Sequence, residues 1–405
     1  MVTRKKRRIA KVPEQPSGTL DLQIPPEKAE PASIGNVLMM VIPMLGSTGV
    51  MIFMALQQQQ QQSNPRMLLM GGGMLVAMLG MVGFNMYRQF SQYRTRVVTQ
   101  RREYLSYLAE TREAVRKVAK KQRAYYNWVY PDPDALVTLA ANGSRLWSRE
   151  GNTYDLLAFR YGSGTQPLGL TFNRPPIDPM TEMDVVCLSA MDRFIGVHDH
   201  TDNVGMFLYL GDFSHIEVAG EGESVYDEMR AIMMHLACFI EPSKLKIAVL
   251  CSADRLGDWE WVKWMPQARS SLVRDAVGPG RMISTDPAEL AEMIGPDIPM
   301  RGPFRLTDDM PEWPHLLLVC DGAEFPSSSP LASPSGVRGV TIMSRAREWT
   351  PMTSHTTLRL VIHPSADRNG SDVVDVVTMD SVPESAHADR LSAVQAEAIA
   401  RRMTP

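Results

Sequence analysis

The chain has 405 residues, a formal net charge of −3 and 44% apolar residues. A net charge so close to zero predicts no extended surface for nucleic acid or other polyanions. The four cysteines show no CxxC spacing, which argues against a zinc site and favours buried, reduced thiols over disulfides.

Two apolar runs near the start determine how the rest of the chain is interpreted. Val37–Leu56 and Met67–Tyr87 are separated by the polar linker QQQQQQSNPR, and neither run contains Asp, Glu, Lys or Arg. Each is about 20 residues long, which is enough to cross a roughly 30 Å hydrocarbon core as a helix. We therefore predict a transmembrane hairpin over residues 37–87, rather than two buried helices of a soluble protein or a cleaved signal peptide.

Basic residues flank this hairpin on both sides. They are dense in the segment 1–36 and again after Tyr87, whereas the linker has only Arg66. Positive residues stay on the cytoplasmic side, so both termini are predicted to be cytoplasmic in a multi-pass protein of the inner (plasma) membrane. The N-terminal tract could also be a nucleic-acid arm, but beside a span we interpret it as contacting the lipid bilayer, and no nucleic-acid partner is expected.

A helical stalk is predicted over residues 88–130, because Arg88–Tyr126 contains neither Pro nor Gly and Pro131 cannot continue a helix. Within the stalk a stripe recurs at alternating spacings of four and three. The stripe consists of Tyr104, Leu108, Thr111, Val115, Val118, Gln122 and Tyr125. We expect it to dock on a partner's helix or on a second copy of the chain. The residues expected to make that contact are Tyr104, Leu108, Val115 and Val118.

Residues 131–405 alternate apolar runs with amphipathic helical patterns, which predicts a cytoplasmic α/β domain with mainly parallel strands. The expected strands are 155–161, 216–219, 246–251, 315–320, 340–343 and 358–362. A turn is expected at 162–164 and a helix over Val225–Phe239. Ser392 and Gln395 form a capping box that opens a C-terminal helix.

The glycine-rich turn after the strand 216–219 is the place to look for nucleotide chemistry. Gly220, Gly222 and Ser224 stand between a strand and a helix, as in a P-loop. The turn lacks the Lys that reaches the phosphates, and it places Glu221 and Glu223 where they would repel an anion. Asp321 ends an apolar strand and resembles a magnesium-binding position. We predict a degenerate P-loop that is retained for structure, with no catalytic residue and no bound cofactor in this portion.

Two other clusters carry weaker signals. His198 and His200, with their acidic neighbours, could bind a metal, but a polar loop before a strand explains them equally well and no metal is expected. Three tryptophans come within six residues, and on a short helix they cannot all face one core. At least one of Trp259, Trp261 and Trp264 is therefore expected in an interface or under a neighbouring segment.

Several segments resemble the EccC family, the membrane ATPases of type VII (ESX) secretion systems, and the resemblance covers nearly the whole chain. The segments are Tyr104–Leu108 (YLSYL), Pro131–Pro133 (PDP), Leu146–Arg149 (LWSR), Trp259–Pro266 (WEWVKWMP) and Ala388–Pro405. The tryptophan segment is the most specific match. Gln267 and Tyr130 stand where the family usually has His.

The resemblance implies two membrane spans, a stalk and a degenerate ATPase domain of P-loop NTPase type, in a homo-oligomeric complex with EccB, EccD and EccE. It also implies three FtsK/SpoIIIE-type ATPase domains after Pro405, which would use ATP and Mg and engage WXG100-type substrates. The chain would then be a portion of a longer protein or a split-gene product. The implied role is to anchor and couple the motor for protein export. The alternative is a membrane-anchored nucleotide sensor or ATPase that works through the α/β domain itself.

Overall fold

The computed structural model describes residues 12–30, 65–149, 154–276, 278–306, 313–346, 349–365 and 370–404, with scattered residues between 35 and 57. Contacts divide the chain into two units. The stalk unit consists of Ser17–Val118 and Gly169–Asp199, and the sheet unit consists of Met1–Pro16, Ala119–Leu168 and His200–Pro405. Each unit is described by itself.

The longest element is helix α2, which runs without interruption over Pro65–Val129. It contains the second apolar run and the predicted stalk, and it ends just before Tyr130 and Pro131, so the long helix is confirmed. The first run, Val37–Leu56, lies largely outside the described residues. Within the part of the chain that the structure describes, no helix has the combination of length and apolarity that a membrane crossing requires.

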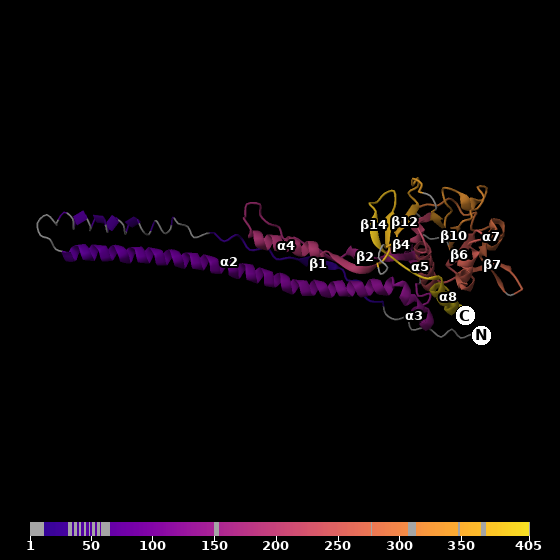
Figure 1. The fold of residues 1–405 in the computed structure, drawn as a ribbon, viewed down its shortest axis with the longest axis horizontal. Helices are drawn as coiled ribbons and strands as arrows, with labels where there is room; N and C mark the ends of the chain where they lie inside the picture. The colour runs from indigo at the N-terminus through magenta and orange to yellow at the C-terminus, as the bar shows by residue number, and fades with distance from the viewer. Residues whose placement is uncertain are drawn as a thin grey trace. The chain divides into compact units, whose positions relative to one another are not determined.

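The stalk unit packs three short elements along α2 (Figure 1). They are β1 (Gly18–Asp21), β3 (Leu170–Asn173) and α4 (Val185–His198). β1 and β3 pair in parallel, with Gly18 opposite Leu170. Asp184 caps α4 by accepting from the backbone N–H of Val186 and Cys187, and its carboxylate also pairs with Arg101 of α2 at 2.8 Å.

The sheet unit is built on one ten-stranded sheet (Figure 1). In spatial order the strands are β4 (His200–Tyr209), β2 (Ala158–Pro167), β14 (Glu384–Ala388), β13 (Val373–Val377), β12 (Thr357–His363), β5 (His215–Gly220), β11 (Val340–Ala346), β10 (His315–Asp321), β6 (Leu245–Cys251) and β9 (Ile283–Ser284). The five predicted strands from 216 to 362 are confirmed as β5, β6, β10, β11 and β12.

The sheet is mixed, so the prediction of mainly parallel strands is confirmed only in part. All pairs from β12 to β9 are parallel, and all pairs from β4 to β12 are antiparallel. The parallel strands β6 and β10 are buried on both faces and appear in the sequence as nearly continuous apolar runs, as in HLLLVC. The antiparallel strands carry polar residues, and β13 and β14 are five residues long, which makes their pattern weak.

Each face of the parallel half carries its own core, because successive side chains point to opposite faces. Ile247 and Val249 join the larger core with α5 (Ser224–Phe239), α3 (Pro133–Asn142) and α8 (Ala393–Met403). Ala248 and Leu250 join the smaller core under α7 (Pro287–Ile294). Helix α8 begins with the predicted capping box of Ser392 and Gln395.

The remaining elements are short. They are η1 (Tyr154–Leu157), η2 (Leu210–Asp212), α6 (Leu256–Trp259), η3 (Glu260–Trp264), η4 (Pro266–Ala268), β7 (Arg269–Arg274), β8 (Pro279–Arg281) and η5 (Pro330–Ala332). β7 and β8 pair as an antiparallel hairpin beside the main sheet.

The predicted turn at 162–164 is wrong, because β2 runs straight through its glycines. Strand β14 approaches so closely that a Cβ on Gly162 would lie 2.4 Å from the carbonyl oxygen of His387. At Gly164 a Cβ would lie 3.0 Å from the Met206 side chain. These glycines therefore permit close strand packing rather than a reversal of the chain.

Candidate functional site

Helix α5 links the two candidate sites of the sheet unit: its N-terminus follows the glycine turn, and its later turns contact the end of α2. Numbered one to five in chain order, β5, β6, β10, β11 and β12 lie in the spatial order 5-1-4-3-2. The first strand therefore lies inside the parallel half, and its carboxyl end lies on the same edge as that of β10. Ligands of open α/β sheets bind outside such an edge.

The glycines of the turn allow backbone conformations and close contacts that other residues would not. Gly220 has a φ of 144°, and a Cβ there would lie 2.7 Å from the carbonyl oxygen of Ile362, because β12 passes close by. Gly222 has a φ of 74° with open space around it. Helix α5 then starts at Ser224 without a side-chain cap from Glu223. The local geometry is that of a strand–turn–helix connection.

Carboxylates surround the start of α5. Glu223 and Asp227 both pair with Arg230, the latter at 2.8 Å. The side chain of Ser224 hydrogen-bonds Asp372, which also pairs with Arg390 at 2.6 Å. Burial raises the pKa of Asp372, but the hydrogen bonds from Arg390 and Ser224 outweigh burial and hold that pKa below its usual value. Several carboxylates therefore lie at the helix N-terminus, where an anionic ligand would be repelled.

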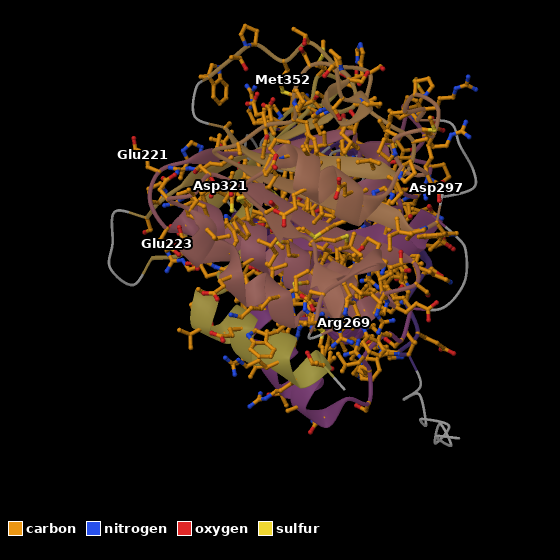
Figure 2. The ribbon with its side chains drawn as sticks, turned by 90° about the vertical axis from the view of Figure 1, so that its right-hand side faces the viewer. Glu221, Glu223, Arg269, Asp297, Asp321 and Met352 are labelled. Carbon is orange, nitrogen blue, oxygen red and sulfur yellow. The ribbon has the colours of Figure 1, made fainter. Side chains whose placement is uncertain are left out.

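Asp321 ends β10 and is buried, and protein donors already surround its carboxylate. It accepts from the indole N–H of Trp259 at 2.9 Å, from Arg255 at 3.4 Å and from the Tyr226 hydroxyl at 3.5 Å. Figure 2 places Asp321 on the same side of the sheet unit as Glu221 and Glu223. In this arrangement Asp321 fixes an aromatic cluster in place.

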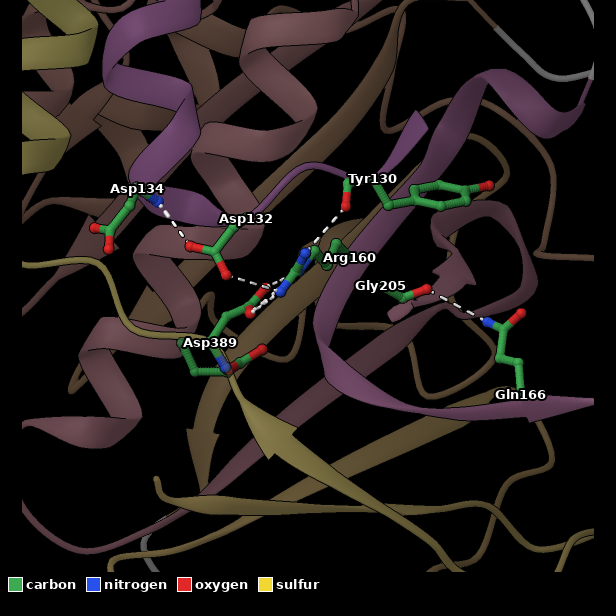
Figure 3. Close-up of polar contacts among 8 residues, drawn as sticks. Tyr130, Asp132, Asp134, Arg160, Gln166, Gly205 and Asp389 are labelled. Carbon is green, nitrogen blue, oxygen red and sulfur yellow. Dashed lines mark hydrogen bonds and ion pairs between the residues drawn. The ribbon is translucent and has the colours of Figure 1, made fainter. Parts of the chain in front are cut away.

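The end of α2 is fixed to the sheet by one buried arginine (Figure 3). Arg160 of β2 forms a fork with Asp389, with contacts of 2.8 and 3.0 Å, and reaches Asp132 at 3.2 Å. It also donates to the carbonyl oxygen of Tyr130 at 3.0 Å. The side chains of Arg160 and Asp389 are 4% and 5% exposed, so the fork between them lies away from water, whereas Asp132 is largely exposed. We call the residues Tyr126–Pro133, Arg160, Glu228 and Asp389 the junction.

Helix α5 contributes a fully buried carboxyl to the junction. Glu228 accepts from the backbone N–H of Asp389 at 2.9 Å with one oxygen, and its other oxygen has no hydrogen-bond partner among the described residues. Burial, and next the charge of Asp389, raise the pKa of Glu228 well above its usual value. Burial raises the pKa of Asp389 to about 6, against the lowering effect of Arg160. The pair therefore retains a proton to higher pH than free carboxyls do.

Aromatic and cationic side chains surround the same helix end. Tyr130 stacks on Phe207 of β4, with ring centroids 4.3 Å apart. Arg149 donates to the carbonyl oxygen of Val129 at 3.3 Å, and its guanidinium lies over the ring of Phe239. Burial lowers the pKa of Arg149 to about 10. The segments 131–133, 146–149 and 388–405, which are far apart in the sequence, thus contribute to one structure around the end of α2.

The three tryptophans all reach the larger core, so the expectation that they cannot is wrong. The α-helix ends at Trp259 and continues as the 3₁₀ turn η3. In a 3₁₀ helix residues three apart eclipse each other, which puts Trp261 and Trp264 on one face. Trp259 and Trp261 are buried. Trp264 packs against the core beneath Arg401 of α8, so one of the three lies under a neighbouring segment, as was expected of at least one of them.

Gln267 closes the C-terminal end of α5. Its amide donates to the carbonyl oxygens of Ala237 at 2.8 Å and Ile240 at 2.9 Å. These carbonyls would otherwise lack helical partners. A hydrogen-bond donor is therefore what this position requires.

The stalk stripe is covered by the chain's own segments rather than left open for a partner, which corrects the docking prediction. Tyr104, Leu108 and Val115 are buried, and Val118 is half-buried. The Tyr104 hydroxyl donates to the carbonyl oxygen of Gln23 at 3.2 Å, and burial raises its pKa to about 12. The heptad spacing correctly indicated a buried face, but it could not identify the segment that buries it.

The histidine pair does not assemble a metal site in the structure described. His198 ends α4 and stacks edge-on against Phe194, and His200 begins β4. Nowhere among the described residues do three or more metal-ligating side chains come together.

Sequence reasoning missed the junction. A signal was present, since Arg160 interrupts an apolar strand. A charge in such a run indicates a buried ion pair. Its partners could not be named, because Asp132 and Asp389 lie 28 and 229 positions away from Arg160.

Comparison with known proteins gives a consistent group of relatives, although no family model matches the chain. The ESX secretion system protein EccC of Thermomonospora curvata is 32% identical over 413 residues, covering all of this chain and 30% of the relative. The ESX-3 protein EccC3 of Mycobacterium tuberculosis is 30% identical, covering 84% of this chain and 25% of the relative. The ESX-1 protein EccCa1 of the same species is 28% identical, covering 75% of this chain and 39% of the relative. The chain thus spans well under half the length of these relatives.

Proposed function

The chain belongs to the EccC family of ESX secretion systems, and from this premise we propose that it anchors and couples the motor of a type VII secretion machine. In this proposal the two apolar runs hold it in the inner membrane with both termini in the cytoplasm, and α2 connects the membrane to the sheet unit. The ATPase domains that the resemblance implies would follow, use ATP and Mg, and engage WXG100-type substrates. EccB, EccD, EccE and further copies of the chain would be its partners.

The junction is the observation that carries the coupling role. Arg160 ties the last carbonyl of the helix end, at Tyr130, to Asp389 just before α8. Residues Ala119–Val129 of α2 belong to the same compact unit as the sheet. A helix end held by buried, charge-assisted bonds moves with the sheet. Displacement of α2 would therefore be transmitted to the sheet unit.

Exposed apolar side chains support membrane anchoring. Val76, Leu79, Phe84 and Tyr87 of α2 are 63–72% exposed. Contiguous exposed apolar surface on a helix requires a partner or a lipid environment. Together with the basic flanks, this favours the bilayer.

Coupling can be tested by interrupting the helix end without altering either side of it. We insert Gly-Ser-Gly-Ser between Trp128 and Val129, because such a linker is flexible. The matched control carries the same insertion between Asp275 and Ala276 in the exposed β7–β8 hairpin. In cells carrying the remaining secretion components, we expect the first variant to enter the membrane complex but export no substrate, and the control to export normally. Normal export by both variants would refute coupling through the junction.

A nucleotide sensor in the sheet unit is the second candidate, and one feature favours it. A cavity of about 620 Å³ opens at the carboxyl ends of β10 and β11. Its lining includes Arg345 and Ser344, but also the carboxylates of Glu217 and Glu324. Titration of the full chain with ATP and Mg separates the candidates. Saturable binding that is lost in Gly222→Asp would favour the sensor, and its absence would favour coupling alone.

A further inference from the structure

Three cations gather on the β7–β8 hairpin and at the start of β6. Arg269 is the first residue of β7 and lies opposite Arg281 of β8 in the hairpin register. Lys246, the second residue of β6, donates its ammonium to the carbonyl oxygen of Arg269 at 3.1 Å. Figure 2 shows Arg269 well away from Glu221 and Asp321, so this cluster is separate from the glycine turn.

Among the residues that the structure describes, these cations have no counter-charge. Arg269, Arg281 and Lys246 take part in none of the ion pairs that the described residues form. Nε of Arg269 and Nη1 of Arg281 are buried without a hydrogen-bond acceptor among those residues. Burial, and next the charge of Arg281, lower the pKa of Arg269, and burial lowers the pKa of Lys246. Like charges opposite one another on a hairpin destabilise it unless an anion lies between them.

The number and type of these groups indicate the anion. A guanidinium is planar and binds the oxygens of a carboxylate or phosphate in pairs, and an ammonium acts as a compact point charge. A phosphate carries one negative charge as a diester and up to two as a monoester. Its oxygens are arranged tetrahedrally and can reach cations on different strands, whereas the two oxygens of a carboxylate lie in one plane. We propose that Arg269, Arg281 and Lys246 form a binding site for a phosphate group, supplied by a free phosphate monoester or by a phospholipid headgroup.

The test uses the full chain and two soluble probes, inorganic phosphate and glycerophosphoglycerol, each compared with chloride at constant ionic strength. Thermal unfolding is followed by tryptophan fluorescence, and we expect a saturable rise in Tm. A stronger response to inorganic phosphate identifies a free phosphate as the ligand, and a stronger response to the diester identifies a headgroup. Arg269→Gln and Arg281→Gln should each weaken apparent binding roughly tenfold or more, since each removes charged hydrogen bonds.

Arg274→Gln is the matched control, because Arg274 lies on the same hairpin but is exposed and lies opposite Pro279. It should bind both probes as the wild type does. In chloride alone, Arg281→Gln should unfold at or above the wild-type Tm, because it relieves repulsion. No saturable response to either probe, an equal loss of binding in Arg274→Gln, or a lower Tm of Arg281→Gln in chloride would each overturn the proposal.

Discussion

The glycine turn before α5 and the junction treat charge in opposite ways. In the turn Glu221 and Glu223 are exposed, and its course is held by backbone geometry. In the second turn of α5 Glu228 is fully buried, and it joins Arg160 and Asp389 in a buried network. Buried charge is costly unless it is paired, so such a network persists where a fixed geometry is required. The difference teaches that this fold is most tightly specified at the helix junction and less so at the edge where a nucleotide would bind.

The largest effect is expected from removing the junction arginine. Arg160→Met leaves two buried carboxyls without their cation, which should cost about 3–5 kcal/mol of unfolding free energy. Arg255→Met is the matched change beside the glycine turn, where the arginine is 28% exposed and 3.4 Å from Asp321, and it should cost about 1 kcal/mol. All seven tryptophans lie in the sheet unit, so urea unfolding followed by their fluorescence measures both. Equal losses of unfolding free energy in the two variants would remove the contrast between the junction and the glycine turn.

The buried acid pair should make stability depend on pH. The pKa of Asp389 is raised to about 6 in the folded chain, so the folded state binds more protons than the unfolded state. Stability is then fully present below the ordinary pKa near 4 and is lost as pH rises through about 6. Glu228→Gln removes one member of the pair and should flatten this loss and stabilise the chain at pH 8 by about 1–3 kcal/mol. An unchanged slope between pH 4 and 8 would contradict this account.

A smaller loss is expected at the C-terminal end of α5. Gln267→Leu removes two donors and leaves the carbonyls of Ala237 and Ile240 buried without them, at a cost of about 1–2 kcal/mol. Gln267→His restores a ring N–H at this position and should recover most of that stability. The same urea unfolding experiment measures both variants. If histidine is no better than leucine, the position does not act as a donor to the helix end.

The smallest loss of unfolding free energy is expected from a substitution in the glycine turn. Gly222→Ala places a Cβ at a φ of 74° with no neighbour to clash, so only backbone strain of about 1 kcal/mol is expected. Gly257→Ala, in the short helix α6 with open space around it, should be neutral or slightly stabilising. A loss above about 3 kcal/mol in Gly222→Ala would show that the turn is as tightly specified as the junction.

The sequence predicted those parts of the fold whose signals are local. β5, β6, β10, β11 and β12 each contain a short apolar-rich segment, nearly continuous in β6 and β10, and the capping box of α8 lies within four residues. The antiparallel half was missed because β13 and β14 are short and because the glycines of β2 were taken for a turn. The candidate sites were likewise predicted only where their residues are close in the sequence. The glycine turn is contiguous and was found, whereas the junction joins Asp132, Arg160 and Asp389 from three distant segments, and no spacing rule connects them.

Amide hydrogen exchange tests the central claim most directly, namely that the end of α2 is one cooperative unit with the sheet. The amide of Tyr130, which donates to the carbonyl oxygen of Tyr126 at 2.7 Å, should exchange as slowly as those of Phe159 in β2 and Met229 in α5. The amides of Gly222 and Glu223 should exchange orders of magnitude faster. In the junction variant Arg160→Met, protection of Tyr130 should fall while that of the central strands remains. If Tyr130 already exchanges in the wild type as fast as Gly222, the helix end frays independently and cannot transmit displacement to the sheet.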